Sequence, residues 1–204
     1  GRRRMRAALG YGDGDVVIAY LGLLTPYQGV DLLLEIVPRV LAALPAAKFL
    51  IMGFPNEDAY RARAEAAGLG SVVRFTGRIR YEDAPAHIAV GDVAVSPKLS
   101  ATEGNGKLLN YMAMGVPTVA FDTPINRGIL GDLGVYARLG DRDELAARLI
   151  ELARDAGRRA QLSRDLRRRA VEHFSWRARA RQFEAVYERL LGGRSEPRLL
   201  AAAE

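Results

Sequence analysis

Short apolar runs alternate with longer stretches of helical periodicity, and this alternation constrains the fold more than any other feature of the chain. The first run, residues 15–21, ends at Gly22 and precedes a helical pattern over residues 29–44. Further runs follow at 48–52, 72–75, 92–96 and 118–121, with helices expected through 60–67, 82–90 and 107–114. Strands that are apolar throughout are buried on both faces, so the pattern predicts a parallel sheet with helices on both sides.

We therefore predict an α/β fold, a Rossmann-like doubly wound parallel sheet with extra C-terminal helices. A shorter piece is expected at 135–138, and the extra helices at 141–154, 158–173 and 175–191. With 204 residues and 49% hydrophobic content, the chain can bury one sizeable core. We assign residues 1–192 to a single domain and residues 193–204 to a flexible C-terminal tail.

Several classes of protein are excluded or disfavoured by composition. The chain has no cysteine, which excludes disulfides and cysteine-based metal sites. Charged residues, namely Asp31, Glu35 and Arg39, interrupt the longest apolar stretch, so no membrane span is predicted. Because the chain begins at Gly1 without an initiator Met, we expect a piece of a longer protein.

The net charge of +6 comes largely from arginines in the last third of the chain. Such a density favours either nucleic acid or an anionic membrane surface as a partner. Apolar residues recur between these arginines at helical spacing, however, as at Leu162, Leu166 and Ala170. We interpret the arginines as solvated outer faces of helices and expect no nucleic-acid partner, since no RNA-binding signature accompanies them.

The stretch EGNGKLLNYMAMGVPTVAFD, residues 103–122, joins a glycine-rich loop, a lysine, a short helix and a strand. Gly104 and Gly106 allow close approach of the backbone to a ligand, and Lys107 stands where the helix begins. In a doubly wound sheet the loop 98–106 lies at the carboxyl ends of the strands, as do the loops 22–29 and 77–80. The three loops are predicted to converge on one anion site, although glycine-rich turns also open helices that bind nothing.

These residues resemble the C-terminal half of GT-B glycosyltransferases of the type often called family 4. The resemblance is carried by Gly22-Leu23-Leu24-Thr25-Pro26-Tyr27-Gln28-Gly29, by Gly77, by Asp92 and Pro97, and by the segment from Glu103 to Pro117. It implies a retaining hexosyltransferase that uses a UDP-, GDP- or ADP-sugar and requires no metal or other cofactor. It also implies a missing N-terminal GT-B domain with the acceptor site, a cytoplasmic location, and contact with the membrane surface.

The chain departs from the family pattern at positions that matter for binding a diphosphate. The first loop usually reads G-R-x-x-P-x-K-G, so Leu23 and Gln28 replace two cations. In the E-x7-E region, Asn110 replaces the second glutamate, and Glu103 takes the first place only if the loop is one residue shorter. Each charge-assisted hydrogen bond contributes about 1.5–3 kcal/mol, so we expect weakened donor binding, or binding that needs a partner domain.

From the resemblance we assign Glu103, near the transferred sugar, and Lys107, at the leaving phosphate, to the chemistry. The predicted donor-binding residues are Gly22, Gln28, Arg78, Ile79, Asn105, Gly106, Lys107 and Asn110. Asn110 is expected at the ribose and the loop 77–80 at the base. Lys98 and Arg80 are within reach of the same loops.

Simpler interpretations stay open for several of these residues. Lys107 can be a solvated lysine of a first turn, and Asn110 an ordinary amide on a helix surface. Asp13-Gly14-Asp15 is read as a turn before the first strand rather than as a metal-binding pair. For the whole chain, the alternative is a non-catalytic binding module with a degenerate donor site, and a GT-B epimerase or hydrolase would share this half.

Overall fold

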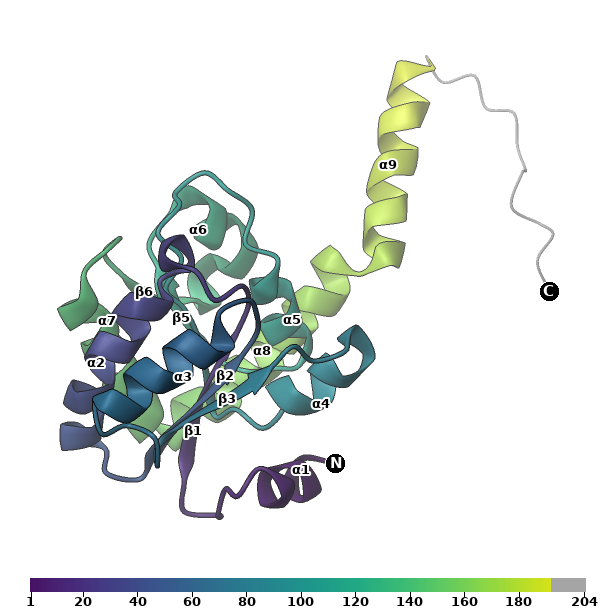
Figure 1. Cartoon of the computed structure of the whole chain (residues 1–204). Coiled ribbons are helices and arrows are strands. Elements are labelled where there is room, and N and C mark those ends of the chain that lie inside the picture. The colour runs from purple at the N-terminus through teal and green to yellow at the C-terminus, as the bar shows by residue number, and fades with distance from the viewer. Residues whose placement is uncertain (192–204) are drawn as a thin grey trace.

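The computed structural model describes residues 1–191 (Figure 1). It contains a six-stranded parallel sheet with the strand order β3-β2-β1-β4-β5-β6. The strands are β1 (Val16–Leu21), β2 (Ala47–Met52), β3 (Val73–Gly77), β4 (Val93–Ser96), β5 (Thr118–Phe121) and β6 (Val135–Ala137). This order confirms the predicted Rossmann-like doubly wound fold. The predicted tail, residues 193–204, lies outside the described residues.

Successive side chains of a strand point to opposite faces of the sheet. Because the strands are apolar on both faces, a layer of helices covers each face. On one face, Ile18 and Tyr20 of β1 belong to a core shared with α2 (Val30–Ala43), α3 (Glu57–Ala66) and α7 (Arg142–Arg154). On the other, Val17 and Ala19 pack with α4 (Ala84–Ile88), α5 (Lys107–Ala113), α6 (Pro124–Leu130) and α8 (Ala156–Arg169). Two separate cores therefore flank one buried sheet, as the apolar runs predicted.

Several helices differ from the sequence prediction. The helix expected at 82–90 is a 3-10 turn, Tyr81–Asp83, followed by α4, in which Pro85 stands in the first turn. The helix expected at 158–173 ends as α8 at Arg169 and continues as a π turn, Ala170–Phe174. Neither α1 (Arg2–Ala8) nor α6 was predicted, although α6 carries the N-cap of Thr123 and a proline at its first turn.

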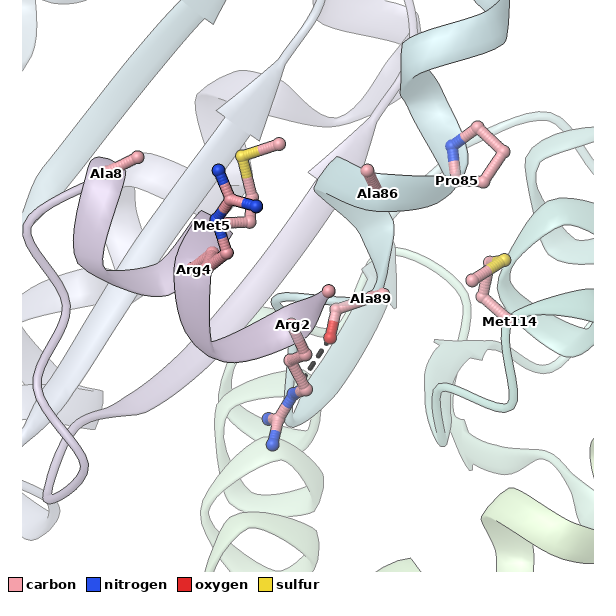
Figure 2. Close-up of a pocket in the computed structure, with 9 residues that line it drawn as sticks. Arg2, Arg4, Met5, Ala8, Pro85, Ala86, Ala89 and Met114 are labelled. Carbon is pink, nitrogen blue, oxygen red and sulfur yellow. Dashed lines mark hydrogen bonds between the residues drawn. The ribbon is translucent and has the colours of Figure 1, made fainter.

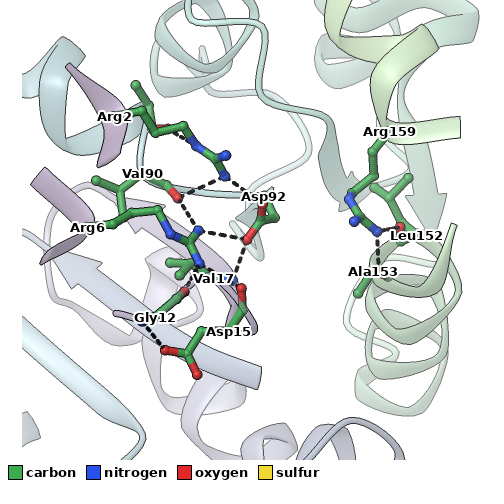
Figure 3. A network of polar contacts seen from close by, with 11 residues as sticks. Arg2, Arg6, Gly12, Asp15, Val17, Val90, Asp92, Leu152, Ala153 and Arg159 are labelled. Carbon is green, nitrogen blue, oxygen red and sulfur yellow. Dashed lines mark hydrogen bonds and ion pairs between the residues drawn. The ribbon is translucent and has the colours of Figure 1, made fainter. Parts of the chain in front are cut away.

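An arginine–carboxylate network fixes α1 to the amino ends of β1 and β4 (Figure 3). Arg2 and the buried Arg6 both pair with Asp92, and Arg6 also donates to the carbonyl oxygens of Gly12 and Asp15. Residues 13 and 14 form a turn closed by the hydrogen bond from Gly12 N–H to Asp15 Oδ2. The turn interpretation of Asp13-Gly14-Asp15 is thus confirmed, and it lies at the sheet edge opposite the predicted site.

The loops after β1 and β4 meet where the order of the strands reverses direction. Leu99 N–H donates a hydrogen bond of 3.0 Å to Tyr27 O. Gly29 has φ +77°, and a Cβ built on it would lie 2.0 Å from Pro97 O, so only glycine allows this approach of the two loops. Ligands of doubly wound sheets bind at such a switch point.

The last helix, α9 (Trp176–Leu190), extends away from the body of the domain (Figure 1). None of its residues is buried. Within residues 1–191, no helix has both the length and the apolar character that crossing a bilayer requires.

Candidate functional site

Lys107, Gln28 and Gly22 meet at the carboxyl edge of the sheet, between β1 and β4. Lys107 begins α5, and its Nζ donates a hydrogen bond of 2.7 Å to Oε1 of Gln28. A Cβ built on Gly22 would lie 2.7 Å from the same Nζ, so the ammonium group rests against the glycine backbone. Gln28 is buried at the end of the 3-10 turn Pro26–Gln28. The structure thus brings Lys107 of α5 against two predicted site residues of the loop after β1.

Two buried tyrosines position this contact, and the sequence analysis missed both. Tyr20 OH donates a hydrogen bond of 2.8 Å to Leu23 O and accepts one of 3.4 Å from Lys107, whose Nζ lies 4.5 Å from the Tyr20 ring centroid. Tyr111, one helical turn after Lys107, accepts a bond of 2.7 Å from Leu21 N–H. Burial raises the pKa of both phenols far above the ordinary value, so both stay protonated. For Tyr20, the sequence signal was a tyrosine just before the last residue of an otherwise aliphatic run, residues 16–21.

The pKa of Lys107 is lowered to about 7, chiefly because burial disfavours the charged form. The positive charge of Lys98 lowers it further, and the negative charge of Glu103 partly opposes the shift. Its hydrogen bonds to Gln28 and Tyr20 make Lys107 a partly buried, fixed side chain rather than the solvated first-turn lysine of the simpler interpretation. Both protonation states are populated near neutral pH, and an anion at this position would favour the charged state.

Lys98 is a buried side chain that binds two residues of the glycine-rich loop. Its side chain is 4% exposed, and its Nζ donates to Gly104 O at 2.8 Å and pairs with Glu103 Oε2 at 2.9 Å. The carboxylate of Glu103 is therefore held by Lys98 on the loop that borders the Lys107 cluster. Its expected role near a transferred sugar stays a prediction.

Asn105 anchors the same loop to the sheet and to α6. Its Nδ2 donates to Ser96 Oγ at 2.9 Å and to Asn126 Oδ1 at 2.8 Å, and all three residues are buried. Because these hydrogen bonds occupy the Asn105 side chain, the group of Asn105 expected to contact a ligand is its main-chain N–H. That contact, and the one expected of the Gly106 N–H, stay predictions.

The remaining predicted residues lie on neighbouring loops and helices. Arg78 places its guanidinium 4.7 Å from the Phe54 ring centroid, and Ile79 packs against the core beneath α4 and α5. Asn110 lines a hollow of about 90 Å³ together with Tyr81, Pro85 and Met114. Within the described chain, no hydrogen bond links Arg78, Ile79 or Asn110 to Lys107 or Gln28, so their expected roles at base and ribose stay predictions.

A larger cavity, of about 550 Å³, lies between α1 and α4 (Figure 2). Figure 2 shows Arg2 bonded to Ala89 O beside the apolar side chains of Met5, Pro85 and Met114. None of the predicted site residues lines this cavity. We place the candidate site at Lys107 instead, because perturbed titratable groups and polar side chains converge there.

Comparison with known proteins adds a family match. The family described as Glycosyl transferases group 1 matches residues 15–155. A phosphatidyl-myo-inositol mannosyltransferase of Mycobacterium leprae is 30% identical over 165 residues, which cover 80% of this chain and 43% of the relative. A GDP-mannose-dependent alpha-(1-6)-phosphatidylinositol monomannoside mannosyltransferase of Mycolicibacterium smegmatis is 30% identical over 210 residues, with 97% and 53% covered. The chain spans about half the length of these curated relatives.

Solved structures show the same fold. Anabaena HepE, determined in complex with UDP, superposes with a TM-score of 0.79 at 20% identity, covering 91% of this chain and 52% of that one. Here too the chain corresponds to about half of the neighbour. The fold class predicted from the sequence is confirmed by this likeness.

Proposed function

We propose that this chain is the donor-binding domain of a glycosyltransferase and that it holds the diphosphate of a nucleotide sugar. The chain belongs to the glycosyl transferases group 1 family, whose model matches residues 15–155. One observation carries the proposal: Lys107, Gln28 and Gly22 are in contact at the carboxyl edge between β1 and β4. This edge is where doubly wound folds bind nucleotides. A partly buried lysine with a glycine backbone beside it suits a phosphate group.

The chemistry follows from the charge that develops during sugar transfer. The glycosidic bond to the diphosphate breaks through an oxocarbenium-like state, and the nucleoside diphosphate leaves as an anion. Lys107, fixed by Tyr20 and Gln28, would stabilise that anion without reorganising, which is the most effective form of electrostatic catalysis. We propose retention of configuration and hexosyl transfer because the motifs resemble those of retaining enzymes.

The donor is proposed to be a UDP-, GDP- or ADP-sugar. A relative is named for its dependence on GDP-mannose, and a structural neighbour was solved with UDP. Base contacts are expected from the backbone of residues 77–80. The relatives are named for action on phosphatidylinositol lipids, which supports a lipid acceptor and work at a membrane surface. The cytoplasmic side of that membrane is proposed from the family resemblance alone.

A second domain is proposed to carry the acceptor site, as in GT-B enzymes. Its support is that the chain spans about half of its relatives and that α9 exposes an apolar face. That face consists of the exposed residues Trp176, Phe183, Val186, Tyr187 and Leu190. We therefore expect the isolated chain to bind the donor but to transfer little or no sugar.

Titration calorimetry with UDP, GDP and ADP tests donor binding directly. We expect heat with at least one nucleotide, and a loss of roughly tenfold to hundredfold in affinity on Lys107→Gln. Lys48→Gln is the matched control, because Lys48 lies near the start of β2, at the opposite edge of the sheet. Absence of heat with all three nucleotides at millimolar concentration would refute the proposal and favour the non-catalytic module.

A further inference from the structure

The loop after β1 contains no basic residue, yet a cation lies against it. Residues 22–29 read GLLTPYQG, and only three of the 30 basic residues of the chain are lysines, at 48, 98 and 107. Two of those three lysines lie at the candidate site. Lysine, unlike arginine, can be buried in a partly neutral form. The placement of lysines therefore marks this edge of the sheet as chemically different from the arginine-rich surface.

The cation comes from α5 and ends at Gln28. Lys107 Nζ and Gln28 Oε1 are 2.7 Å apart, so the ends of the two side chains are in direct contact although 79 residues separate them in the sequence. Gln28 is 7% exposed, and its position is fixed because Gly29 packs against Pro97. Gln28 can therefore hold the ammonium group in a defined position.

The charge of Lys107 is left uncompensated in this arrangement. Its hydrogen-bond acceptors, Gln28 and Tyr20, are neutral. Glu103, whose negative charge raises the pKa of Lys107, is already paired with Lys98. Within residues 1–191, Lys107 forms no ion pair of its own. A partly buried ammonium group that has only neutral partners gains from pairing with the negative charge of a bound ligand.

We propose that Lys107 and Gln28 act as one exchangeable pair, in which α5 supplies the cation for the donor diphosphate and Gln28 is the positioning residue that aims it. The inference rests on the proposed function, because it names which residues hold the diphosphate of that donor. In this arrangement the loop 22–29 has lost its own cations, but the site has not lost its positive charge. The charge is relocated to another element, so amide and ammonium can exchange places between positions 28 and 107.

A charge exchange tests the pair. The variants are Lys107→Gln, Gln28→Lys and the double variant. Each is titrated with UDP, GDP and ADP and, as probes without phosphate, with uridine, guanosine and adenosine. We expect Lys107→Gln to lose roughly tenfold to hundredfold in nucleotide affinity and the double variant to recover to within about threefold of the original chain. Affinity for the nucleosides should be the same in all variants, because they lack the charge that Lys107 meets.

The single variant Gln28→Lys tests whether positions 28 and 107 are coupled in the folded protein, independently of nucleotide binding. It places a second ammonium group against Lys107, near Lys98, so we expect a lower midpoint of urea unfolding for this variant than for the double variant. Gln161→Lys, on the surface of α8, is the matched control for the added charge. Equal midpoints for the single and double variants would contradict the pair.

Gln28→Glu provides a test that does not depend on the double variant folding. It keeps the shape of the side chain but turns the neutral acceptor into a carboxylate that neutralises Lys107. We expect it to lose as much nucleotide affinity as Lys107→Gln, while Gln161→Glu on α8 binds like the original chain. Unchanged affinity of Gln28→Glu would overturn the proposal.

The possible failures are distinguishable. If the original chain binds none of the nucleotides, the proposed function fails and the pair falls with it. If the original chain binds UDP, GDP or ADP but the folded double variant is as weak as Lys107→Gln, the proposed function stands and the exchangeable pair is refuted.

Discussion

Lys107 has a pKa of about 7 in the free domain, and this should make donor binding depend on pH. A diphosphate favours the charged form, so the bound state has the higher pKa and takes up a proton when the solution lies between the two values. Affinity should be highest below about pH 7 and should fall by up to about tenfold per pH unit above it, until the pKa of the bound state is reached.

The measurement is the affinity for UDP-glucose and GDP-mannose from pH 6 to pH 9, since their diphosphates have no terminal phosphate that titrates near pH 6. The groups that act on Lys107 are Tyr20, Gln28, Lys98 and Glu103, and burial keeps Tyr20 protonated throughout this range. The double variant His87→Gln/His173→Gln is the control, because histidine also titrates near neutral pH. A constant affinity across this range would contradict the prediction.

Gly29 is the residue whose backbone most directly shapes the site. Its φ of +77° costs other residues about 1–2 kcal/mol, and a Cβ would overlap Pro97 O at 2.0 Å. We expect Gly29→Ala to lower the free energy of urea unfolding by more than this strain alone and to displace Gln28. Gly104→Ala is the control, with no atom within 4 Å of its added Cβ. If both variants were equally stable, the close packing of the two loops would be refuted.

At the scale of elements, Tyr111 joins α5 to the end of β1. Its phenol oxygen accepts the Leu21 N–H at 2.7 Å in a fully buried position. Tyr111→Phe leaves that N–H without a partner, so we expect a loss of about 1–3 kcal/mol in the free energy of unfolding, measured with urea. Tyr187→Phe on the exposed face of α9 should cost almost nothing. A similar effect of the two substitutions would remove Tyr111 from the role of joining α5 to β1.

The strands were predictable because each is a short run of apolar residues that the sheet buries on both faces. Helix boundaries were less predictable, because tertiary packing decides them. α1 has few apolar positions and is held by the pairs of Arg2 and Arg6 with Asp92, which join residues more than 80 positions apart. No local pattern contains that contact. For α6, the cap of Thr123 and the following Pro124 were visible and could have been read.

The site was predictable as a set of loops but not as a set of contacts. The glycines at 22, 104 and 106 and the order of the strands predicted which loops converge. The pairing of Lys107 with Gln28, and of Lys98 with Glu103, depends on side-chain paths across the switch point that spacing does not encode. Gln28 looked like a lost cation in the sequence, and in the structure it is the hydrogen-bond partner of a cation from α5.

At the scale of the molecule, the described residues have two unequal parts: a sheet domain with two buried cores, and α9, which contributes no buried residue. The apolar side chains of α9 lie at helical spacing on one face, from Trp176 through Phe183 to Leu190. A helix with such a face gains stability by covering it, at about 25 cal/mol per Å² of apolar area. This supports a second domain that packs on α9, as proposed for the complete enzyme.

Trp176 reports on that packing, because it is the only tryptophan of the chain and its side chain is 91% exposed. In the isolated chain we expect the fluorescence of a water-exposed indole, quenched freely by acrylamide and unchanged by UDP. In a longer protein that includes the second domain, the emission should shift to shorter wavelength and quenching should fall. Dilution of the isolated chain controls for self-association through α9. Equal quenching in both forms would show that the face around Trp176 stays open and that the second domain packs elsewhere.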